Sequence, residues 1–282
     1  MREAIMPVAL RNLEPLLLRV LAAAFMLFII VFIAIPIVIN LTMSFSDAAM
    51  IRFPITGWSM RWYRDFFGSE QWTAALVNSI VIALGTTVIS TSAGILAAWA
   101  FERFPIPFKD GWYVIIMMPL FMPGVVLGLG VAIAFGGTSI GGYSIYGSRE
   151  LVMIAHSLWA MPLVFMLMEA TFRTIDHRIL EASYDLGGRP VRTFFEIVMP
   201  MVSTGIVSSA LSAFVISLNE FVMALFLTDR DTQTLPVLMW LSLRSAGTPR
   251  LAVASVILAL AVFACLTLIM VWYVRELTKT SR

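Results

Sequence analysis

The stretch EASYDLGGRPVRTFFEIVMP, residues 181–200, lies between two hydrophobic runs that are each long enough to cross a bilayer. It carries acidic and basic side chains and a Gly-Gly pair, so it is polar and rich in turn formers. A spanning helix needs about 20 mainly apolar residues, because the hydrocarbon core of a bilayer is about 30 Å thick. Residues 181–200 therefore predict a loop of a multi-span membrane protein.

Composition supports the same class. Hydrophobic residues make up 60% of the 282 residues and charged residues only 13%, whereas a soluble domain has about a quarter charged residues. The net charge of +2 and the lack of a basic run argue against a nucleic-acid partner. Cys265 is the single cysteine, which excludes a disulfide within one chain, and with only two histidines no metal site is expected.

Six segments of the chain are long and apolar enough to span the bilayer, so the sequence predicts an all-α membrane protein with six transmembrane helices. The first is too long in its apolar core for a cleavable signal peptide. The six segments are Leu16–Met43, Thr73–Phe101, Trp112–Phe135, Leu151–Phe172, Val198–Thr228 and Leu251–Val274.

Basic residues predict the orientation, since cytoplasmic loops carry an excess of Lys and Arg. With both termini inside, 12 of the 19 Lys and Arg residues fall on the inner side. We therefore expect a cytoplasmic N-terminal segment at 1–15, a membrane domain at 16–274 and a cytoplasmic tail at 275–282. The loop at 173–200 is then also cytoplasmic. Between the first two spans, the aromatic residues of segment 46–72 predict a piece at the membrane interface.

The local pattern of the 173–200 loop predicts two short helices. Asp176 can cap the start of the first helix, and Gly187 and Gly188 can close it. Pro190 suits the first turn of a second helix. In the first helix, Ile179, Ala182, Ser183 and Leu186 share one face, and Arg178, Glu181 and Asp185 share the other. The small side chains at 182 and 183 would allow another surface to come close.

At these residues the loop resembles the EAA motif of ABC importer permeases, in which Glu-Ala-Ala and a glycine are followed by an isoleucine and Leu-Pro. Glu181, Ala182 and Gly187 match the pattern, and Ser183 stands in place of the second alanine. Ile197 and Pro200 match its end, with Met199 in place of leucine. Both departures are conservative.

The resemblance implies an energy-coupling role for this loop. Glu181, Ala182, Ser183, Asp185 and Gly187 would form the contact with a cytoplasmic ATPase dimer and the turn behind it. Ile197 and Pro200 would anchor the loop to its transmembrane helix. Since the chain has no GxxxxGK[ST] element, we expect no cofactor in it, and ATP and Mg²⁺ would be used by the partner ATPase.

A finer resemblance, to spermidine/putrescine-type permeases, covers most of the chain. It implies a type I ABC importer permease fold (MetI-like) in the bacterial inner membrane. It further implies a second permease subunit, commonly a different chain, and a periplasmic solute-binding protein, with a polyamine or similar small solute as cargo. The segments that carry this resemblance are WYRDFF at 62–67, ALVNS at 75–79, MPLFMPG at 118–124, LEASYDLGG at 180–188 and SLNEF at 217–221.

Four residues are candidates for the solute path or its gate. Glu220 is the one carboxylate well inside a predicted span, where an ionised group needs water, a partner or a cargo; Asn219 adds an amide beside it. Asn78 in the second span could bond across helices or face the path. Pro123, with Pro119 and Gly124, interrupts the third span, either to line the path or as a packing kink. For Glu220, the alternative to a cavity or gate is a polar contact between helices.

The rival interpretation is a self-sufficient transporter or channel coupled to an ion gradient. Such proteins often have more spans, inverted repeats and several buried charges, whereas this sequence has six predicted spans and no visible repeat. An enzyme is less well supported still, because no nucleophile–base pair or set of metal ligands converges in the spans.

Overall fold

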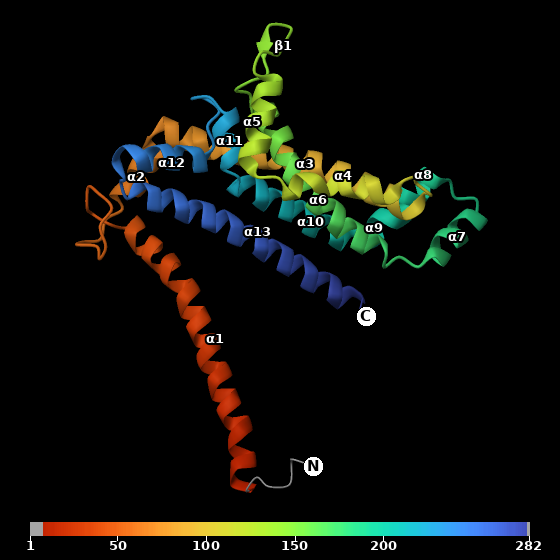
Figure 1. Ribbon diagram of the computed structural model, residues 1–282, viewed down its shortest axis with the longest axis horizontal. Helices are drawn as coiled ribbons and strands as arrows, with labels where there is room; N and C mark the ends of the chain where they lie inside the picture. Colours follow the sequence, from red (N-terminus) through yellow and green to blue (C-terminus); the bar gives the residue numbers. More distant parts are fainter. Residues whose placement is uncertain (1–7, 281–282) are drawn as a thin grey trace.

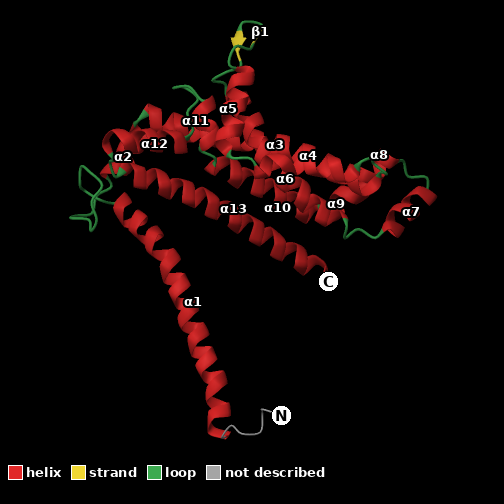
Figure 2. Cartoon of the chain, in the orientation of Figure 1, coloured by secondary structure: helices red, strands yellow, loops and turns green. Residues whose placement is uncertain are grey.

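The computed structural model describes residues 8–280 of the chain; residues 1–7 and 281–282, which include parts of the two expected terminal segments, lie outside the described residues. Helices make up nearly all of the described regular structure (Figure 2). Within the described range, the strands are confined to β1, Ser139–Ile140, and β2, Tyr143–Ser144, which pair antiparallel in a small hairpin. The predicted all-α class is confirmed.

Among the residues that the structure describes, four helices are long and apolar enough to cross a membrane, and two bent helix pairs bring the number to six if each pair is one span. The four are α1, Val8–Ser44; α3, Glu70–Arg103; α6, Arg149–Phe172; and α13, Arg250–Thr280. The first bent pair is α4, Lys109–Phe121, with α5, Gly124–Phe135, at 101°. The second joins Pro190–Met201 to α10, Ser203–Asn219, at 76°.

The expected third and fifth spans are therefore not straight, continuous helices. The third turns sharply between α4 and α5, after Pro119 (Figure 1). The fifth consists of several pieces, because α10 ends at Asn219 and the chain continues as a separate short helix. The shorter helices are α2, Arg61–Gly68; α7, His177–Asp185; α8, Pro190–Thr193; a π-helix, Phe194–Val198; α9, Met199–Met201; α11, Val222–Leu227; and α12, Leu235–Ala246.

Helices α3, α6 and α10 form the centre of the bundle (Figure 1). Their packing is close because small residues lie where the helices meet. A Cβ at Gly94 of α3 would come within 2.6 Å of Val164 Cγ1 on α6, so this approach depends on glycine. Val164, Phe165 and Ala213 in the adjoining core are fully buried.

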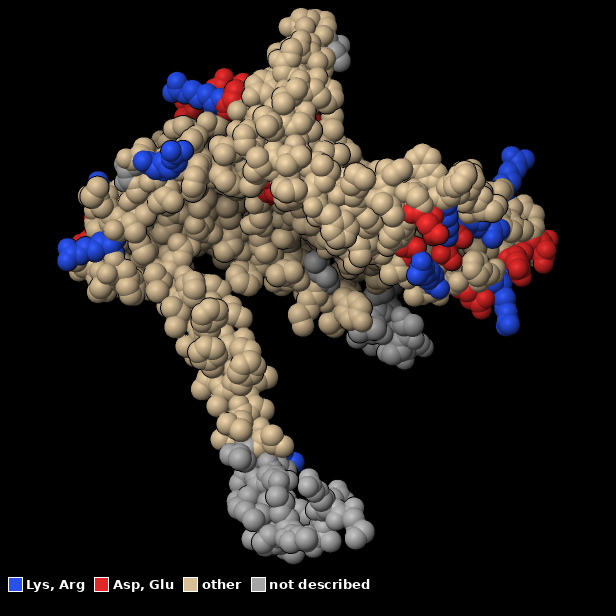
Figure 3. Space-filling model, in the orientation of Figure 1, with Lys and Arg blue, Asp and Glu red and all other residues tan. Residues whose placement is uncertain are grey.

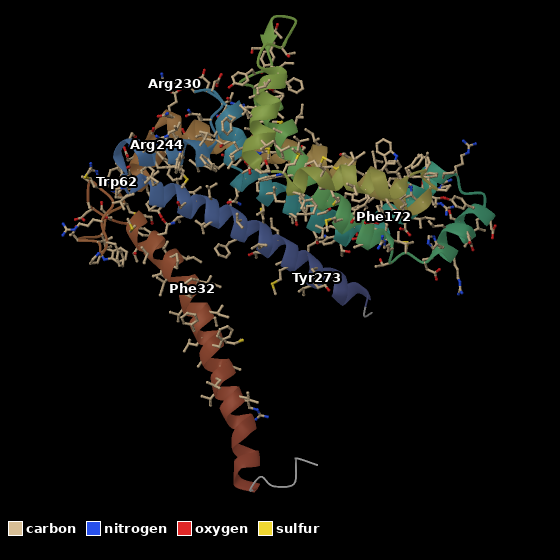
Figure 4. All side chains as sticks on the ribbon, viewed as in Figure 1. Phe32, Trp62, Phe172, Arg230, Arg244 and Tyr273 are labelled. Carbon is tan, nitrogen blue, oxygen red and sulfur yellow. The ribbon has the colours of Figure 1, made fainter. Side chains whose placement is uncertain are left out.

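Helix α1 diverges from the bundle and meets the rest of the protein near its C-terminal end (Figure 1). From Leu18 to Leu41 most of its large apolar side chains are exposed, among them Phe25 and Phe28. Phe32 is 68% exposed (Figure 4). An apolar helix without a protein neighbour is stable where lipid or another subunit covers it. Helix α1 therefore has the surface of a membrane-embedded element.

The aromatic segment before α3 packs more deeply than its sequence predicts. Trp62 and Phe66 of α2 and Trp72 of α3 are buried in a core cluster with residues of α13, while Trp58 and Phe67 remain exposed. The amphipathic pattern of α2 thus arises largely from packing on protein. An ion pair between Asp65 and Arg250, the first residue of α13, fastens α2 to that helix, with an Arg250 Nε to Asp65 Oδ2 distance of 2.6 Å.

Candidate functional site

The 173–200 loop forms a projection at one end of the bundle, made of α7 and α8 (Figure 1). Helix α7 begins as expected, since the Asp176 carboxylate accepts a hydrogen bond of 3.0 Å from the backbone N–H of Arg178. It is closed by Gly187, whose φ of +81° lies in the left-handed region that favours glycine. The Gly188 N–H then donates to the Ser183 carbonyl at 2.8 Å. The predicted cap and turn are confirmed.

Helix α7 is held on the bundle by a face that the sequence pattern did not single out. Leu180 is its one buried residue, at 2% exposure, and Tyr184 packs beside it against the main core cluster. The Arg103 guanidinium from the end of α3 lies over the Tyr184 ring, 5.5 Å from its centroid. The predicted apolar face instead points largely outward: Ala182 is exposed, and Leu186 is 90% exposed.

Unlike its neighbours in the motif, Ser183 makes a side-chain hydrogen bond within the loop. Its hydroxyl lies 2.8 Å from the Thr193 hydroxyl, which links α7 to α8. A Cβ at Gly188 would come within 2.7 Å of the Ser183 carbonyl oxygen, so the turn between the two helices is tightly closed. Ser183 thereby fixes the geometry of the projection, while Glu181, Ala182 and Asp185 remain exposed on α7.

The second half of the loop leads into the membrane helix α10. Pro190 occupies the first turn of α8, as predicted. The chain then passes through the π-helix that contains Ile197 and through α9, which contains Pro200, before the 76° bend into α10. Phe194 anchors this connection against Trp99 of α3, with ring centroids 5.3 Å apart. Ile197 and Pro200 thus lie on the only covalent path from the projection to α10.

Apolar side chains are exposed on this projection among charged ones. Leu186, Val191 and Phe195 are all strongly exposed, and Figure 3 shows acidic and basic side chains gathered at the same end of the molecule. A groove of about 220 Å³ is lined by Ser183, Leu186, Gly187, Gly188, Arg192, Thr193, Glu196 and Ile197. Exposed apolar residues within a polar rim are typical of a protein interaction site.

Glu220 lies at a break between helices rather than in the middle of one. Helix α10 ends just before it and α11 begins two residues after it. The side chain is 7% exposed, and its Oε1 accepts a hydrogen bond of 2.7 Å from the backbone N–H of Met223 in the first turn of α11. The predicted span Val198–Thr228 is therefore interrupted at Glu220, and the carboxylate accepts from the first turn of the helix that follows the break.

Asn219 and Glu220 have different surroundings, although they are neighbours in sequence. The Asn219 Nδ2 donates to the Val215 carbonyl at 2.8 Å. Asn219 also lines a mainly apolar cavity of about 530 Å³, together with Asn40 of α1 and Trp240 of α12. Glu220 does not line that cavity, so the structure does not bring the two residues together in one cavity.

Asn78 bonds across the fold from the second span, one of its two predicted roles. It is 1% exposed, and its Nδ2 donates to the Asp231 carbonyl at 2.8 Å and the Gln233 carbonyl at 3.0 Å. The adjacent Ser79 hydroxyl accepts a hydrogen bond of 2.7 Å from the Leu235 N–H. These bonds fix the connection between α11 and α12 to helix α3.

Pro123 lies at the sharp turn between α4 and α5, just before the first residue of α5, and is exposed. The turn is held from α6, because the Trp159 Nε1 donates to the Pro119 carbonyl at 2.8 Å. A Cβ at Gly124 would lie 3.0 Å from the Trp159 ring, so the glycine lets α5 start close to α6. The structure thus supplies a packing reason for the interruption.

A buried polar chain through the core was not foreseen from the sequence. His156 Nδ1 of α6 lies 2.9 Å from the Ser217 hydroxyl of α10, which donates to the Thr86 hydroxyl of α3 at 3.2 Å. The signal was present, since a histidine in an apolar span requires a polar partner. Its partners are hydroxyls on helices distant in sequence, which no local pattern identifies.

The comparisons with known proteins identify the class of protein. Residues 90–279 match the family described as "Binding-protein-dependent transport system inner membrane component". The chain therefore belongs to this family of transmembrane permease components of ABC importers, which are not themselves enzymes. The resemblance to ABC importer permeases is confirmed.

Two relatives and one solved structure refine this assignment. The putrescine transport system permease protein PotI of Escherichia coli (strain K12) is 30% identical over 80% of this chain and 82% of its own length. The spermidine/putrescine transport system permease protein PotC of Haemophilus influenzae is 27% identical over 84% of this chain and 91% of its own length. The solved structure is that of a bacterial ABC transporter involved in the import of the acidic polysaccharide alginate. The match covers 97% of this chain and 99% of the matched chain, with a TM-score of 0.72 and 14% sequence identity. It confirms the MetI-like fold.

Proposed function

We propose that this chain forms, with a second permease subunit, the translocation path of an ABC importer for a small organic cation of the polyamine type. A solute-binding protein would deliver the cargo, and a separate ATPase dimer would drive the cycle with ATP and Mg²⁺. The single observation that carries this proposal is the projection at 173–200, because it combines exposed Leu186, Val191 and Phe195 with a helical connection to α10.

The geometry of the loop supports energy coupling. The Ser183–Thr193 bond and the Gly188–Ser183 bond tie α7 to the segment that enters α10. Leu180 and Tyr184 seat α7 on the core, so a push on the projection would be transmitted to the bundle rather than absorbed by a free loop. Glu181, Ala182, Asp185 and Leu186 are left exposed for a partner surface.

The proposed cargo class rests on the relatives and on charge. PotI and PotC are named as permeases for putrescine and spermidine/putrescine, which are small amines that carry positive charge at neutral pH. Glu220, the buried carboxylate at the α10–α11 break, would favour a cation in its neighbourhood over an anion. We infer that Glu220 acts at the gate of the path, with Asn78, Asn219 and Pro123 as separate candidate positions for the path or its gate.

We further propose the inner membrane of a bacterium as the location, with both termini and the projection in the cytoplasm. The membrane domain would extend over 16–274, between a segment at 1–15 and a tail at 275–282. The excess of Lys and Arg in the inner segments supports this orientation. It places the projection on the side where ATP is available.

Co-purification tests the coupling site. The membrane-embedded transporter is extracted in mild detergent from cells that carry the chain as wild type, as Leu186→Asp or as Met50→Asp. Both substituted side chains are strongly exposed and apolar, but Met50 lies in the connection between α1 and α2. The Leu186→Asp chain is expected to lose its ATPase subunit, and the Met50→Asp chain to retain it.

Two results would contradict this proposal. One is a wild-type chain that never co-purifies with an ATPase subunit under conditions that preserve its second permease. The other is equal recovery of the ATPase with the Leu186→Asp and Met50→Asp chains.

A further inference from the structure

The buried hydrogen-bond chain that begins at His156 passes through all three central helices. The His156 Nδ1 of α6 lies 2.9 Å from the Ser217 hydroxyl of α10, which donates to the Thr86 hydroxyl of α3 at 3.2 Å. The Thr86 hydroxyl in turn donates to the Met153 carbonyl at 3.3 Å. The chain thus leaves α6 at residue 156 and returns to it at residue 153, so it ties α3, α6 and α10 together at one level of the bundle.

The direction of each bond in this chain can be assigned, because a hydroxyl has only one proton to donate. The Thr86 proton is directed to the Met153 carbonyl, so Thr86 accepts from Ser217. The Ser217 proton is then in use, and the proton between His156 and Ser217 must come from the ring Nδ1. His156 is therefore the donor at the head of the chain.

Ser217 lies where the predicted fifth span breaks. It is in the last turn of α10, and its carbonyl accepts from the Glu220 N–H at 3.3 Å. Glu220 itself has an extended backbone, with φ −70° and ψ 121°, so the helical hydrogen-bond ladder does not continue through it. The Ser217 side chain thus anchors the residue whose carbonyl holds the Glu220 backbone.

The other side of the break is also held. The Glu220 carboxylate accepts from the Met223 N–H, and Met223 is fully buried. A Cβ at Gly128 of α5 would lie 3.0 Å from the Met223 Cα, so α5 and α11 are in close contact at this point. The carboxylate therefore lies between two anchored points, one set by the chain from His156 and the other by the contact with α5.

We propose that His156 is a positioning residue for transport: through Ser217 it fixes the end of α10 and so sets where the Glu220 carboxylate lies. A functional group keeps its position when the residues around it are themselves held by hydrogen bonds and packing. The inference rests on the proposed function, because it takes Glu220 as the group that acts at the gate. It deepens that function by naming the α6 residue that holds this group in place.

The test measures ATP-driven uptake of labelled 1,4-diaminobutane by the complete transporter in proteoliposomes, with the solute-binding protein present. His156→Asn and His156→Leu form a matched pair, because the new side chains are of nearly the same size and only asparagine can donate to Ser217. Ser217→Ala removes the hydroxyl, whereas Ser217→Thr retains one. The control is Ser209→Ala, since Ser209 is also buried in α10 but its hydroxyl bonds to the Ile206 carbonyl of its own helix, at 3.0 Å.

We expect His156→Leu and Ser217→Ala to lower the maximal uptake rate roughly fivefold, without changing the half-saturating concentration of the loaded solute-binding protein. His156→Asn and Ser217→Thr should retain most of the rate, and Ser209→Ala all of it. Since His156 acts through Glu220, His156→Leu should slow the Glu220→Gln transporter by less than about twofold. A general loss of folding would instead slow the wild-type and Glu220→Gln transporters by the same factor.

The proposal is overturned if asparagine and leucine at position 156 give the same uptake rate, or if His156→Leu slows the wild-type and Glu220→Gln transporters by the same factor. If Glu220→Gln alone still slows uptake, either result removes the inference and leaves the proposed gate intact. Ser217→Ala, which deletes a single oxygen atom, decides the comparison should leucine at position 156 prevent assembly. A wild-type transporter that takes up no diamine removes the proposed function, and the inference with it.

Discussion

The carboxylate of Glu220 accepts a hydrogen bond of 2.7 Å from the backbone N–H of Met223, and so caps helix α11 where α10 has just ended. This relationship gives one buried acid two separable properties, an acceptor for the backbone and a negative charge. Glutamine can retain the first and lacks the second, whereas alanine lacks both.

We predict that Glu220→Gln leaves thermal stability close to wild type but slows ATP-driven uptake of a cationic solute, on the order of tenfold if one charge-assisted contact is lost. Glu220→Ala should lower stability as well, by about 1 kcal/mol for the lost cap. Uptake is measured in membrane vesicles, and unfolding by the loss of monodisperse protein on heating. Solute capture by the binding protein serves as the control. Wild-type uptake in the glutamine variant would show that the charge of Glu220 plays no part.

Gly187 offers a test of the rigidity of the projection at 173–200. Its φ of +81° is unfavourable for any residue with a Cβ, while no atom lies within 4 Å of the position that a Cβ would occupy. Gly187→Ala should therefore act through the backbone alone and destabilise the projection by about 1 kcal/mol. Hydrogen exchange of residues 177–193 is expected to accelerate roughly fivefold.

Two further variants serve as controls for Gly187→Ala. Gly187→Asn should have a smaller effect, since asparagine tolerates the left-handed region better. Gly111→Ala places a methyl group in open space at an ordinary φ in α4 and should leave exchange of the loop unchanged. Equal exchange rates in the wild-type and Gly187→Ala proteins would show that the turn is not under this constraint.

The ion pair between Asp65 and Arg250 should contribute to stability more than an isolated surface pair. It is partly buried, and Arg250 also lies over the Trp72 ring, 5.5 Å from its centroid. Asp65→Ala is expected to lower the free energy of unfolding by about 1 kcal/mol, and by less at high salt. Arg250→Asp alone should lower it further. The double variant Asp65→Arg/Arg250→Asp should recover part of the loss.

Thermal unfolding of the three variants in detergent provides this measurement. The matched control is Arg192→Ala, which removes the exposed pair with Glu196 at 2.8 Å and should change the unfolding temperature very little. If the loss of stability in the double variant equals the sum of the losses in the two single variants, the two side chains do not stabilise the protein through their interaction.

The positions of the apolar segments and the local structure of the 173–200 loop could be predicted from sequence, because both depend on residues close together in the chain. Asp176, Gly187 and Pro190 act within one helical turn of the backbone that they cap, close or start. The bend at Pro119 and Pro123 was also signalled, since proline interrupts the hydrogen-bonding ladder. Its angle of 101° was not, because it depends on Trp159 in α6.

The remaining features depend on contacts between distant segments. No proline or glycine marks the break at Glu220, and the sequence pattern there continues as an apolar span. Leu180 is the buried residue of α7 because it belongs to a core cluster with residues of α3, α6 and α10, which helical periodicity cannot reveal. Likewise, Asn78 finds its carbonyl partners 153 and 155 residues further along the chain.

The central claim is that a separate ATPase drives transport through the projection at 173–200, and reconstitution tests it most directly. Proteoliposomes are prepared with the two permease subunits alone, or with the permeases and their ATPase, and uptake of labelled diamine from the solute-binding protein is measured. We predict accumulation only when the ATPase and hydrolysable ATP are both present, and its loss in the Leu186→Asp variant. Accumulation by the permeases alone, driven by an ion gradient, would contradict the account and favour a secondary transporter.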